Sequence, residues 1–256
     1  MTQHRVESST SVPEDRLAWL RQQLGRGGWV GVGAAAEQLG VSEMTIRRDL
    51  ATLEALGEAR RTRGGAQALG PSPFRERSPR NARAKIAIAE KARALVPVIG
   101  AIAIDSSSTM ACLANLLGSA QDLIVVTNGP EAFEALQGRP GIRAILTGGE
   151  RDNRTSSLVG PAAESVAGSF RYDAVFLSCA AIDADLGGLE ATPEEAAVLN
   201  VFASCAANVV VGADSSKLQG SAPVVALRWS EIDLLVTELA PEHSRFDPVR
   251  SSVTIL

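Results

Sequence analysis

Residues 41–66 read VSEMTIRRDLATLEALGEARRTRGGA, and this stretch decides how the N-terminal part of the chain folds. Ser42 is a residue type that caps helix N-termini, and the residues after it predict a helix from Met44 to Gly57. Apolar residues recur on one face of that helix at the period of 3.6, which marks the side facing a core. These residues are Ile46, Leu50 and Leu53.

The opposite face of this helix carries the residues that can meet a partner. Arg48 and Met44 project nearly opposite the apolar stripe, and Thr45 and Arg47 lie on its flanks. Asp49 projects close to the buried edge, so we expect it to orient a neighbour within the domain. In a helix-turn-helix, N-terminal residues of the second helix read base edges in the major groove, where Arg can bridge guanine O6 and N7. We therefore expect Arg48 to read a base and Arg47 to contact phosphate.

The twelve residues that follow, EARRTRGGAQAL (58–69), predict two short strands joined by a turn at Gly64 and Gly65. An isolated Arg-Arg-Asp sequence equally fits an ordinary solvated surface. Three further arginines on the hairpin favour DNA, because they would stand on a wing beside the same groove. The predicted DNA-contacting residues are Ser42, Met44, Thr45, Arg47, Arg48, Arg60, Arg61 and Arg63.

Upstream of this stretch, the sequence predicts a helix from Glu14, a short strand at WVGV (29–32) and a second helix at GAAAEQLG (33–40). Helix, strand, helix, turn, helix and hairpin is the order of a winged helix-turn-helix. Gly31, Gly33 and Ala36 also match the G-x-G-x-x-A pattern of a dinucleotide-binding loop. That pattern lacks a proper preceding strand and a long βαβ unit here, so a turn into the helix is the preferred interpretation.

Charge is distributed unevenly along the 256 residues, whose formal net charge is −4. Residues 1–85 hold 14 Lys plus Arg against 9 Asp plus Glu, whereas residues 86–256 hold 11 against 20. A basic N-terminal third on an acidic body is typical of a polyanion-binding module joined to a domain that needs no polyanion.

Several classes of protein are disfavoured by composition. Three widely spaced cysteines in apolar segments argue against a disulfide framework, and two histidines make a transition-metal site improbable, so no metal and no cofactor is expected. The polar N-terminus lacks the apolar stretch of a signal peptide, and no apolar run reaches the ~18 residues of a membrane span. We expect a cytoplasmic protein that does not bind membranes.

The chain divides into four predicted parts. Residues 1–13 read as a disordered lead-in, residues 14–70 as the winged helix-turn-helix, and residues 71–84 as a linker rich in Pro and Arg. Residues 85–256 alternate β-rich runs with helical stretches, which predicts an α/β domain with a mostly parallel sheet. Its candidate strands are residues 101–105, 123–128, 142–149, 172–182, 208–214, 224–227 and 234–238.

Polar residues gather where the predicted strands end, at the edge of a parallel sheet that usually holds the ligand. The sequence IDSSSTM (104–110) places hydroxyls and backbone N–H groups at the start of a helix, which suits a phosphate but equally suits a simple helix cap. Lys217, one of three lysines in the chain, follows Asp214 at another strand tip and can supply a positive charge to the same anion.

Together these motifs resemble the DeoR family of bacterial transcription regulators, from about Arg16 to Glu238. The sequence at 41–66 is the most specific match, and the resemblance continues through the motifs that include Lys85, Val159–Gly160, Gly187 and the E-E-A-x-V run at Glu194. It implies a winged-helix repressor whose C-terminal domain shares the fold of sugar-phosphate isomerases, binds a phosphorylated sugar-type metabolite and forms homo-oligomers on a double-stranded DNA operator.

The resemblance also implies which residues surround the effector. With the serines of the first strand tip added from the sequence itself, the predicted set is Asp105, Ser106, Ser107, Ser108, Thr109, Thr127, Asn128, Gly148, Gly149, Asp183, Asp214 and Lys217. Four positions depart from the usual pattern. Ser107 and Ser108 stand in place of Gly-Thr, Leu199 in place of Lys, and Glu238 in place of Asp, which bears on the identity of the effector.

Two functions from different classes remain open at this point. The preferred one is a non-enzymatic DNA-binding regulator, a repressor of a carbohydrate or related catabolic operon released by a sugar phosphate. The alternative is a sugar-phosphate isomerase that carries a DNA-binding module. Catalytic turnover of ribose 5-phosphate without DNA binding would favour the enzyme.

Overall fold

A computed structural model describes residues 12–27, 29–56, 58–68 and 73–256. The chain divides into two compact units, Met1–Ser72 and Pro73–Leu256, and each is described by itself. Apart from its last two residues, the lead-in predicted at residues 1–13 lies outside the described residues. So does Gly57, the predicted end of the third helix.

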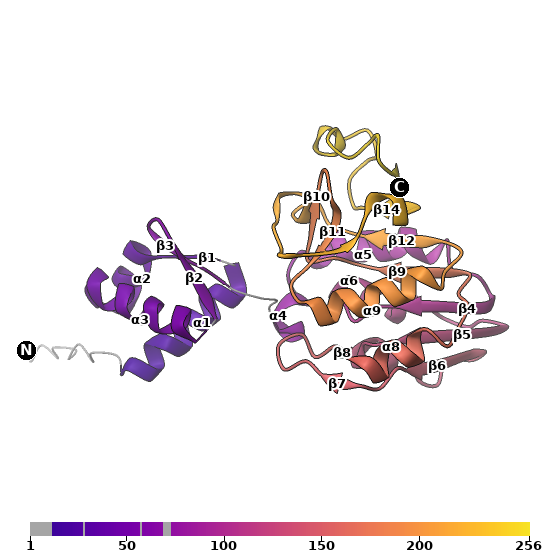
Figure 1. Cartoon of the computed structure of the whole chain (residues 1–256), viewed down its shortest axis with the longest axis horizontal. Coiled ribbons are helices and arrows are strands. Elements are labelled where there is room, and N and C mark those ends of the chain that lie inside the picture. The colour runs from indigo at the N-terminus through magenta and orange to yellow at the C-terminus, as the bar shows by residue number, and fades with distance from the viewer. Residues whose placement is uncertain (1–11, 28, 57, 69–72) are drawn as a thin grey trace, which may run out of the picture. The chain divides into compact units, whose positions relative to one another are not determined.

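The first unit has the element order that the sequence predicts (Figure 1). Its strands form one antiparallel sheet in the order β1-β3-β2, in which β2 is an edge strand. The elements are α1 (Pro13–Gly27), β1 (Trp29–Gly31), α2 (Val32–Leu39), α3 (Glu43–Ala55), β2 (Ala59–Thr62) and β3 (Gly65–Ala68). The predicted winged helix-turn-helix is therefore present in the structure.

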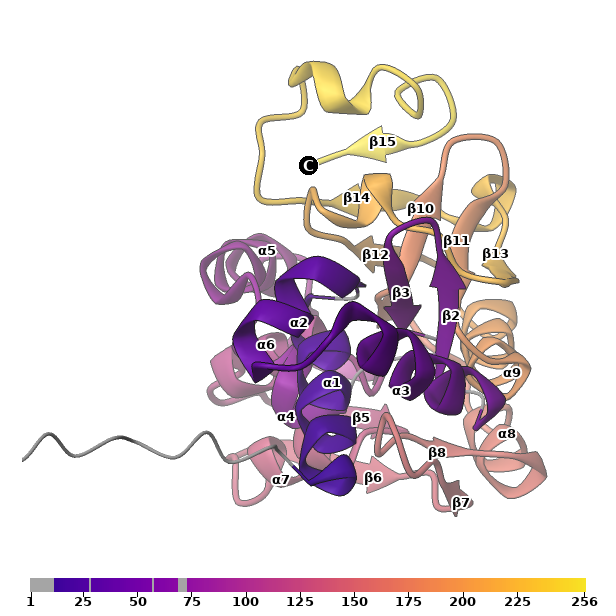
Figure 2. The same cartoon turned by 90° about the vertical axis from the view of Figure 1, so that its left-hand side faces the viewer.

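Helix α3 begins where its cap predicts. The Ser42 side chain accepts a hydrogen bond from the Thr45 backbone N–H at 3.2 Å, which satisfies one of the donors that a helix start leaves unpaired. The predicted apolar stripe is buried, and it packs with residues of α1, α2 and the sheet into one core. Figure 2 shows α3 beside the β2–β3 hairpin.

The second unit is built on a seven-stranded parallel sheet, in the order β15-β14-β12-β9-β4-β5-β6. This confirms the predicted α/β class. The strands are β4 (Ile99–Ile104), β5 (Asp122–Thr127), β6 (Ile142–Leu146), β9 (Ala174–Leu177), β12 (Val209–Gly212), β14 (Leu234–Val236) and β15 (Thr254–Ile255).

Helices cover both faces of this sheet, and each face has its own apolar core (Figure 1). One core lies under α5 (Ala82–Arg93), α6 (Ser108–Leu116) and α7 (Pro130–Leu136). The other lies under α8 (Pro161–Ala167) and α9 (Pro193–Ser204). Because both faces are covered, the strands read as near-continuous runs of Val, Ile, Leu and Ala, as buried parallel strands do.

One predicted strand is shorter than expected, and another is found but lies in a different sheet. The run 172–182 is not one strand, because the chain leaves the sheet after β9 and starts β10 (Ala181–Asp183) in a separate sheet. The run 224–227 forms β13 (Val224–Leu227), but it pairs with β11 (Gly187–Glu190) in that same antiparallel sheet, in the order β10-β11-β13. Short apolar runs occur in both sheets, so the sequence pattern does not separate them.

The remaining elements were not predicted. Within residues 73–84, where we expect a linker, the structure has α4 (Phe74–Arg77) and the first turn of α5. A small antiparallel pair of β7 (Glu150–Arg151) and β8 (Leu158–Val159) follows β6. Three short 3-10 helices complete the unit, at Lys217–Gln219, Trp229–Glu231 and Ser244–Phe246.

Candidate functional site

Helix α3 presents a polar face opposite its buried stripe. Met44 is 64% exposed, and Arg47 and Arg48 are both exposed. Asp49 lies on the buried side, where its carboxylate accepts hydrogen bonds from Arg16 of α1, with Nε 2.8 Å away. The expectation that Asp49 orients a neighbour within the domain is confirmed.

The arginines of this surface differ in their neighbours. Arg47 Nη2 lies 3.0 Å from the Glu43 carboxylate, an exposed pair one helical turn apart that contributes little stability. Arg61 is held more firmly, because both its Nε and its backbone N–H donate to Glu54 of α3. Arg60 and Arg63 are exposed on the hairpin. Arg61 therefore ties the hairpin to α3, whereas Arg48, Arg60 and Arg63 present charge outward.

In the second unit, the strand order reverses between β4 and β9. From β4 the chain adds β5 and β6 on one side, and from β9 it adds β12, β14 and β15 on the other. In open α/β sheets, the crevice beyond the carboxyl ends of the strands at such a reversal is where ligands bind. Asp105 follows β4 and Ser178 follows β9, so both stand at this point.

The Asp105 carboxylate accepts hydrogen bonds from backbone N–H groups at this crevice. Its Oδ1 accepts from the Ser107 N–H at 2.9 Å, and its Oδ2 accepts from the Ser178 N–H at 2.6 Å. Burial raises the pKa of this carboxyl, while these hydrogen bonds and the nearby Lys217 act in the opposite direction. Asp105 thus joins the tips of β4 and β9 and orders the loop into α6.

Two lysines, Lys85 buried and Lys217 half-buried, bring positive charge to the same strand tips. Lys217 Nζ donates to Ser178 Oγ at 2.6 Å, and that hydroxyl donates to the Gly212 carbonyl at the end of β12. Lys85 of α5 is 4% exposed, and its Nζ donates to the Arg77 carbonyl. Burial, together with the Lys217 charge, lowers the pKa of Lys85 to about 8. An anion here would offset both the burial and the repulsion between the two ammonium groups.

Two buried polar atoms without hydrogen-bond partners among the described residues belong to residues that follow β4 and β5. Thr109 and Asn128 are each 1% exposed, yet Thr109 Oγ1 and Asn128 Oδ1 have no hydrogen-bond partner among the described residues. Asn128 does donate its Nδ2 to the Leu158 carbonyl at 3.1 Å. A buried hydroxyl or amide oxygen left unpaired is costly, so these atoms are candidates for contact with a bound polar molecule.

The three serines after β4 have different local roles. Ser107 is the N-cap of α6, and its Oγ accepts from the Met110 N–H at 3.0 Å. Ser106 and Ser108 are buried beside it, and Thr127 is buried at the end of β5, where its Oγ1 accepts from the Gly129 N–H. The simple helix cap considered from the sequence is therefore real for Ser107, and it does not exclude an anion at the same helix end.

Three predicted residues lie away from the reversal point. Gly148 and Gly149 follow the edge strand β6 with φ of 70° and 107°, conformations that glycine adopts most easily. Asp183 ends β10 in the antiparallel sheet, where its Oδ1 accepts from the backbone N–H groups of Asp185 and Leu186. The carboxylate of Asp183 thus closes the β10–β11 turn.

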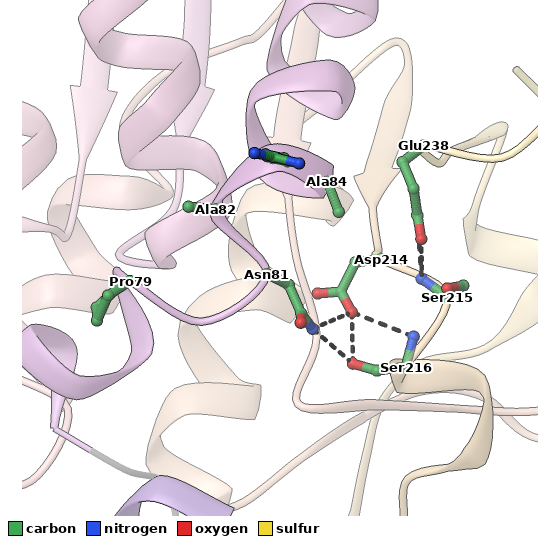
Figure 3. A pocket seen from close by; sticks show the side chains of 9 residues that line it. Pro79, Asn81, Ala82, Ala84, Asp214, Ser215, Ser216 and Glu238 are labelled. Atoms are coloured by element: carbon green, nitrogen blue, oxygen red, sulfur yellow. Dashed lines mark hydrogen bonds between the residues drawn. The ribbon is translucent and has the colours of Figure 1, made fainter.

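Asp214 lines a pocket of about 520 Å³ between the start of α5 and the tips of β12 and β14 (Figure 3). Its Oδ1 accepts from Asn81 Nδ2 at 2.9 Å and from the Ser216 N–H at 3.1 Å. Glu238 accepts from the Ser215 N–H on the far side of the pocket. The pocket is lined by Pro79, Asn81, Ala82, Arg83, Ala84, Asp214, Ser215, Ser216 and Glu238.

A pair of buried carboxyls adds acidic character near Lys217. Glu190 is 8% exposed and Glu195 is 6% exposed. Burial and the neighbouring Glu195 raise the pKa of Glu190 to about 8, and burial also raises the pKa of Glu195, whose Oε1 accepts from Ser157 Oγ at 3.1 Å. Both effects favour the protonated form of Glu190, which can donate a hydrogen bond.

The sequence prediction missed five residues of this region: Arg77, Lys85, Ser178, Glu190 and Glu195. Lys85 carried a usable signal, since it falls on the buried face of α5 with Ile88 and Ala92, where a lysine needs a specific reason. Ser178 and Glu190 gave none, because their positions depend on where β9 ends and on the antiparallel sheet.

The described residues lack two kinds of feature. Their His, Cys, Asp and Glu side chains form no group of three or more that could hold a metal ion. None of their helices is long and apolar enough to cross a membrane.

Comparison with known proteins matches both units of the chain. Residues 16–71 match the model of the DeoR-like helix-turn-helix domain, and residues 80–239 match that of the DeoR C terminal sensor domain. The Transcriptional repressor AccR of Agrobacterium fabrum is 30% identical over 88% of this chain and 89% of its own length. The Glycerol-3-phosphate regulon repressor of Escherichia coli is 29% identical over 85% of this chain and 87% of its own length.

Proposed function

Because the chain belongs to the DeoR family of transcription regulators, we propose that it represses a carbohydrate or related catabolic operon and leaves its operator when a phosphorylated sugar-type effector binds. That it is a DNA-binding repressor with a small-molecule sensor domain follows from the family and from its relatives. The relatives are named as repressors, so the alternative of an isomerase carrying a DNA module is set aside.

The proposed DNA surface is the exposed face of α3 together with the hairpin. Arg48 reads a base, Arg47 contacts phosphate, and Met44, Thr45 and the Ser42 end of the helix lie against the groove. Arg60 and Arg63 contact the backbone beside it. Arg61 acts mainly through Glu54, which keeps the hairpin against α3. We propose that the protein binds as a homo-oligomer in the cytoplasm, since an operator with two half-sites calls for two such modules.

One observation carries the proposed effector: the buried Lys85 and the half-buried Lys217 face the strand-order reversal, and among the described residues no carboxylate is hydrogen-bonded to either ammonium. A phosphate would neutralise them and would also lie at the N-terminus of α6. The orphaned Thr109 Oγ1 and Asn128 Oδ1 and the protonated Glu190 supply polar contacts that suit the hydroxyl groups of a sugar.

The segment that opens the second unit is part of this region. Arg77 donates Nη2 to the Thr155 carbonyl at 3.2 Å and accepts from Lys85, while Asn81 donates to Asp214 and to Ser216 Oγ. Buried Arg77 Nε has no hydrogen-bond partner among the described residues. We propose that effector binding rearranges these contacts and so changes the placement of the residues that lead to the DNA-binding unit.

The test replaces one lysine. Lys217→Ala should bind operator DNA as the wild type does, but a panel of phosphorylated sugars that releases the wild type should leave it bound, because the anion loses its half-buried ammonium partner. Fluorescence anisotropy of a labelled operator measures both properties. Arg143→Ala, which removes an exposed cation of the same unit, is the control and should respond normally. Normal release of Lys217→Ala would contradict the proposed effector site.

A further inference from the structure

An exposed tryptophan lies across the outer face of the sheet in the DNA-binding unit. Trp29 is 52% exposed and pairs across the sheet with Gln67, which in turn pairs with Arg60. The next row, Val30–Ala66–Arg61, faces the opposite way, with Val30 and Ala66 buried. The row after it is Gly31–Gly65–Thr62, on the same face as Trp29.

The indole ring of Trp29 covers this third row. A Cβ atom built on Gly31 would lie 2.8 Å from Trp29 Cη2, and one built on Gly65 would lie 2.8 Å from Trp29 Cζ2. Such distances are far below van der Waals contact, so the ring fits only because both paired residues lack a side chain. Beyond the glycines, Trp29 Nε1 donates to Thr62 Oγ1 at 3.2 Å. One side chain on β1 thereby reaches across β3 to β2.

The three strands joined in this way carry the tip of the hairpin. Thr62 is the last residue of β2, and Arg63 and Gly64 form the turn back to Gly65. Gly64 has φ of 92°, and two glycines in succession make an intrinsically flexible turn. The Gly64 carbonyl also accepts a hydrogen bond from the Val32 N–H at 2.9 Å. An arginine on such a turn meets DNA at a low entropic cost only if the turn is already ordered.

The inner face of the hairpin is fixed separately. Strand β2 is the sheet edge, and the outward-pointing N–H of Arg61 donates to Glu54 Oε1 of α3 at 2.9 Å. Glu54 therefore sets the position of the strand against α3, but it does not reach the turn. The side chain that reaches the end of β2 from the outer face is that of Trp29.

We propose that Trp29 is a positioning residue for operator binding: its indole, seated on Gly31 and Gly65 and bonded to Thr62, holds the turn so that Arg63 meets the DNA backbone. Trp29 itself does not touch the duplex. This role rests on the proposed contact of Arg63 with DNA. It also explains why residue 31 is a glycine, since a side chain there would collide with the Trp29 ring. The dinucleotide-loop interpretation of Gly31 and Gly33 does not account for this contact.

A double-mutant cycle on the full-length chain tests this role. The probe is a fluorescent duplex selected from a random-sequence pool by the wild-type protein, and affinity is measured over a range of salt concentrations. Arg63→Ala should weaken binding and reduce the salt slope by about one, as expected for one lost phosphate contact. Trp29→Ala should change both quantities in the same direction. The double variant should bind no more weakly than Arg63→Ala, because without the Arg63 side chain Trp29 has nothing left to position.

Two further variants separate the proposed role of Trp29 from a general effect of losing an exposed apolar side chain. Trp29→Phe retains a ring over the glycines but lacks the Nε1–H donor, so it should fold as the wild type and show part of the loss in affinity. Leu56→Ala removes another exposed apolar side chain, at the end of α3, and should bind normally in both backgrounds.

The other outcomes are distinct. If Trp29→Ala binds like the wild type while Arg63→Ala is weakened, the positioning role is wrong and the DNA contact stands. If the two losses multiply in the double variant, Trp29 acts independently of Arg63 and the proposal is overturned. If Arg63→Ala binds normally, the proposed wing contact itself fails, and the positioning role fails with it.

Discussion

At the scale of single residues, the two adjacent arginines of α3 have different surroundings and should have different effects. Arg48 projects from the exposed face, so Arg48→Ala should relax base preference at one half-site position by about 1–3 kcal/mol. Arg47 forms an exposed ion pair with Glu43. Because we expect Arg47 to contact phosphate, Arg47→Ala should weaken binding to all sequences alike and flatten the salt dependence. Binding to a set of single-base operator variants separates these outcomes, and identical behaviour of the two variants would contradict the assignment.

Glu190 predicts a pH dependence of stability. The pKa of this buried carboxyl is raised to about 8, against an unfolded value near 4.5. Between these values the folded state holds a proton that the unfolded state has released, so the contribution of Glu190 to stability is fully present below about pH 4.5 and is lost as pH rises toward 8. One such group gives a slope of up to about 1.4 kcal/mol per pH unit.

The variant Glu190→Gln cannot titrate and should lose this contribution. Urea unfolding at several pH values between 5 and 8 should therefore show a flatter pH dependence for the variant than for the wild type. Parallel curves would mean that Glu190 is ionised in the folded protein, and the proposed hydrogen bond from Glu190 to a ligand would then be wrong.

At the scale of elements, α1 and α3 are joined by an ion pair at the edge of a small core. Arg16 and Asp49 are each 8% exposed, and two guanidinium nitrogens contact the carboxylate. Asp49→Ala removes the acceptor while Arg16 stays partly buried, so the first unit should lose about 1–3 kcal/mol of stability. Thermal unfolding followed by circular dichroism measures the loss. Asp49→Asn, which keeps one oxygen, should lose less, and equal stability of all three proteins would show that the pair contributes nothing.

How far the elements follow from the sequence depends on how local their causes are. The cap at Ser42 and the stripe through Ile46 and Leu50 specify α3 by themselves, and the DNA-binding unit was predicted in its correct order. The end of β9 was not, because the backbone at Ser178 is captured by Asp105, 73 residues earlier. Similarly, the site residues Asp105 and Thr109 were predicted from one strand tip, whereas Glu190 comes from a second sheet that periodicity does not distinguish.

At the scale of the whole molecule, the question is how a ligand in the second unit changes DNA binding by the first. Residues 73–81 follow directly from the DNA-binding unit in sequence, and they are attached to the sensor by side chains that belong to the proposed effector region. Asn81 bonds Asp214, and Lys85 bonds the Arg77 carbonyl. An anion bound as proposed would compete for Lys85 with the second of these contacts, and that competition would link ligand binding to the position of this segment.

Breaking one attachment should weaken this linkage without removing the site. Asn81 has φ of 51°, a conformation that glycine also adopts freely, so Asn81→Gly deletes the amide without straining the backbone. Effector affinity measured by calorimetry should change little, whereas the ratio of operator affinities with and without effector should fall, because a normal allosteric coupling of about 1–3 kcal/mol requires a segment that both states hold differently.

The control is Asn115→Ala, whose amide bonds only the Ala111 carbonyl of its own helix among the described contacts and should leave the coupling unchanged. By reciprocity, operator DNA should also alter effector affinity less in Asn81→Gly than in the wild type. A variant that binds the effector and still releases DNA to the full extent would show that the signal leaves the sensor by another route, such as a change in the oligomer, and not through residues 73–81.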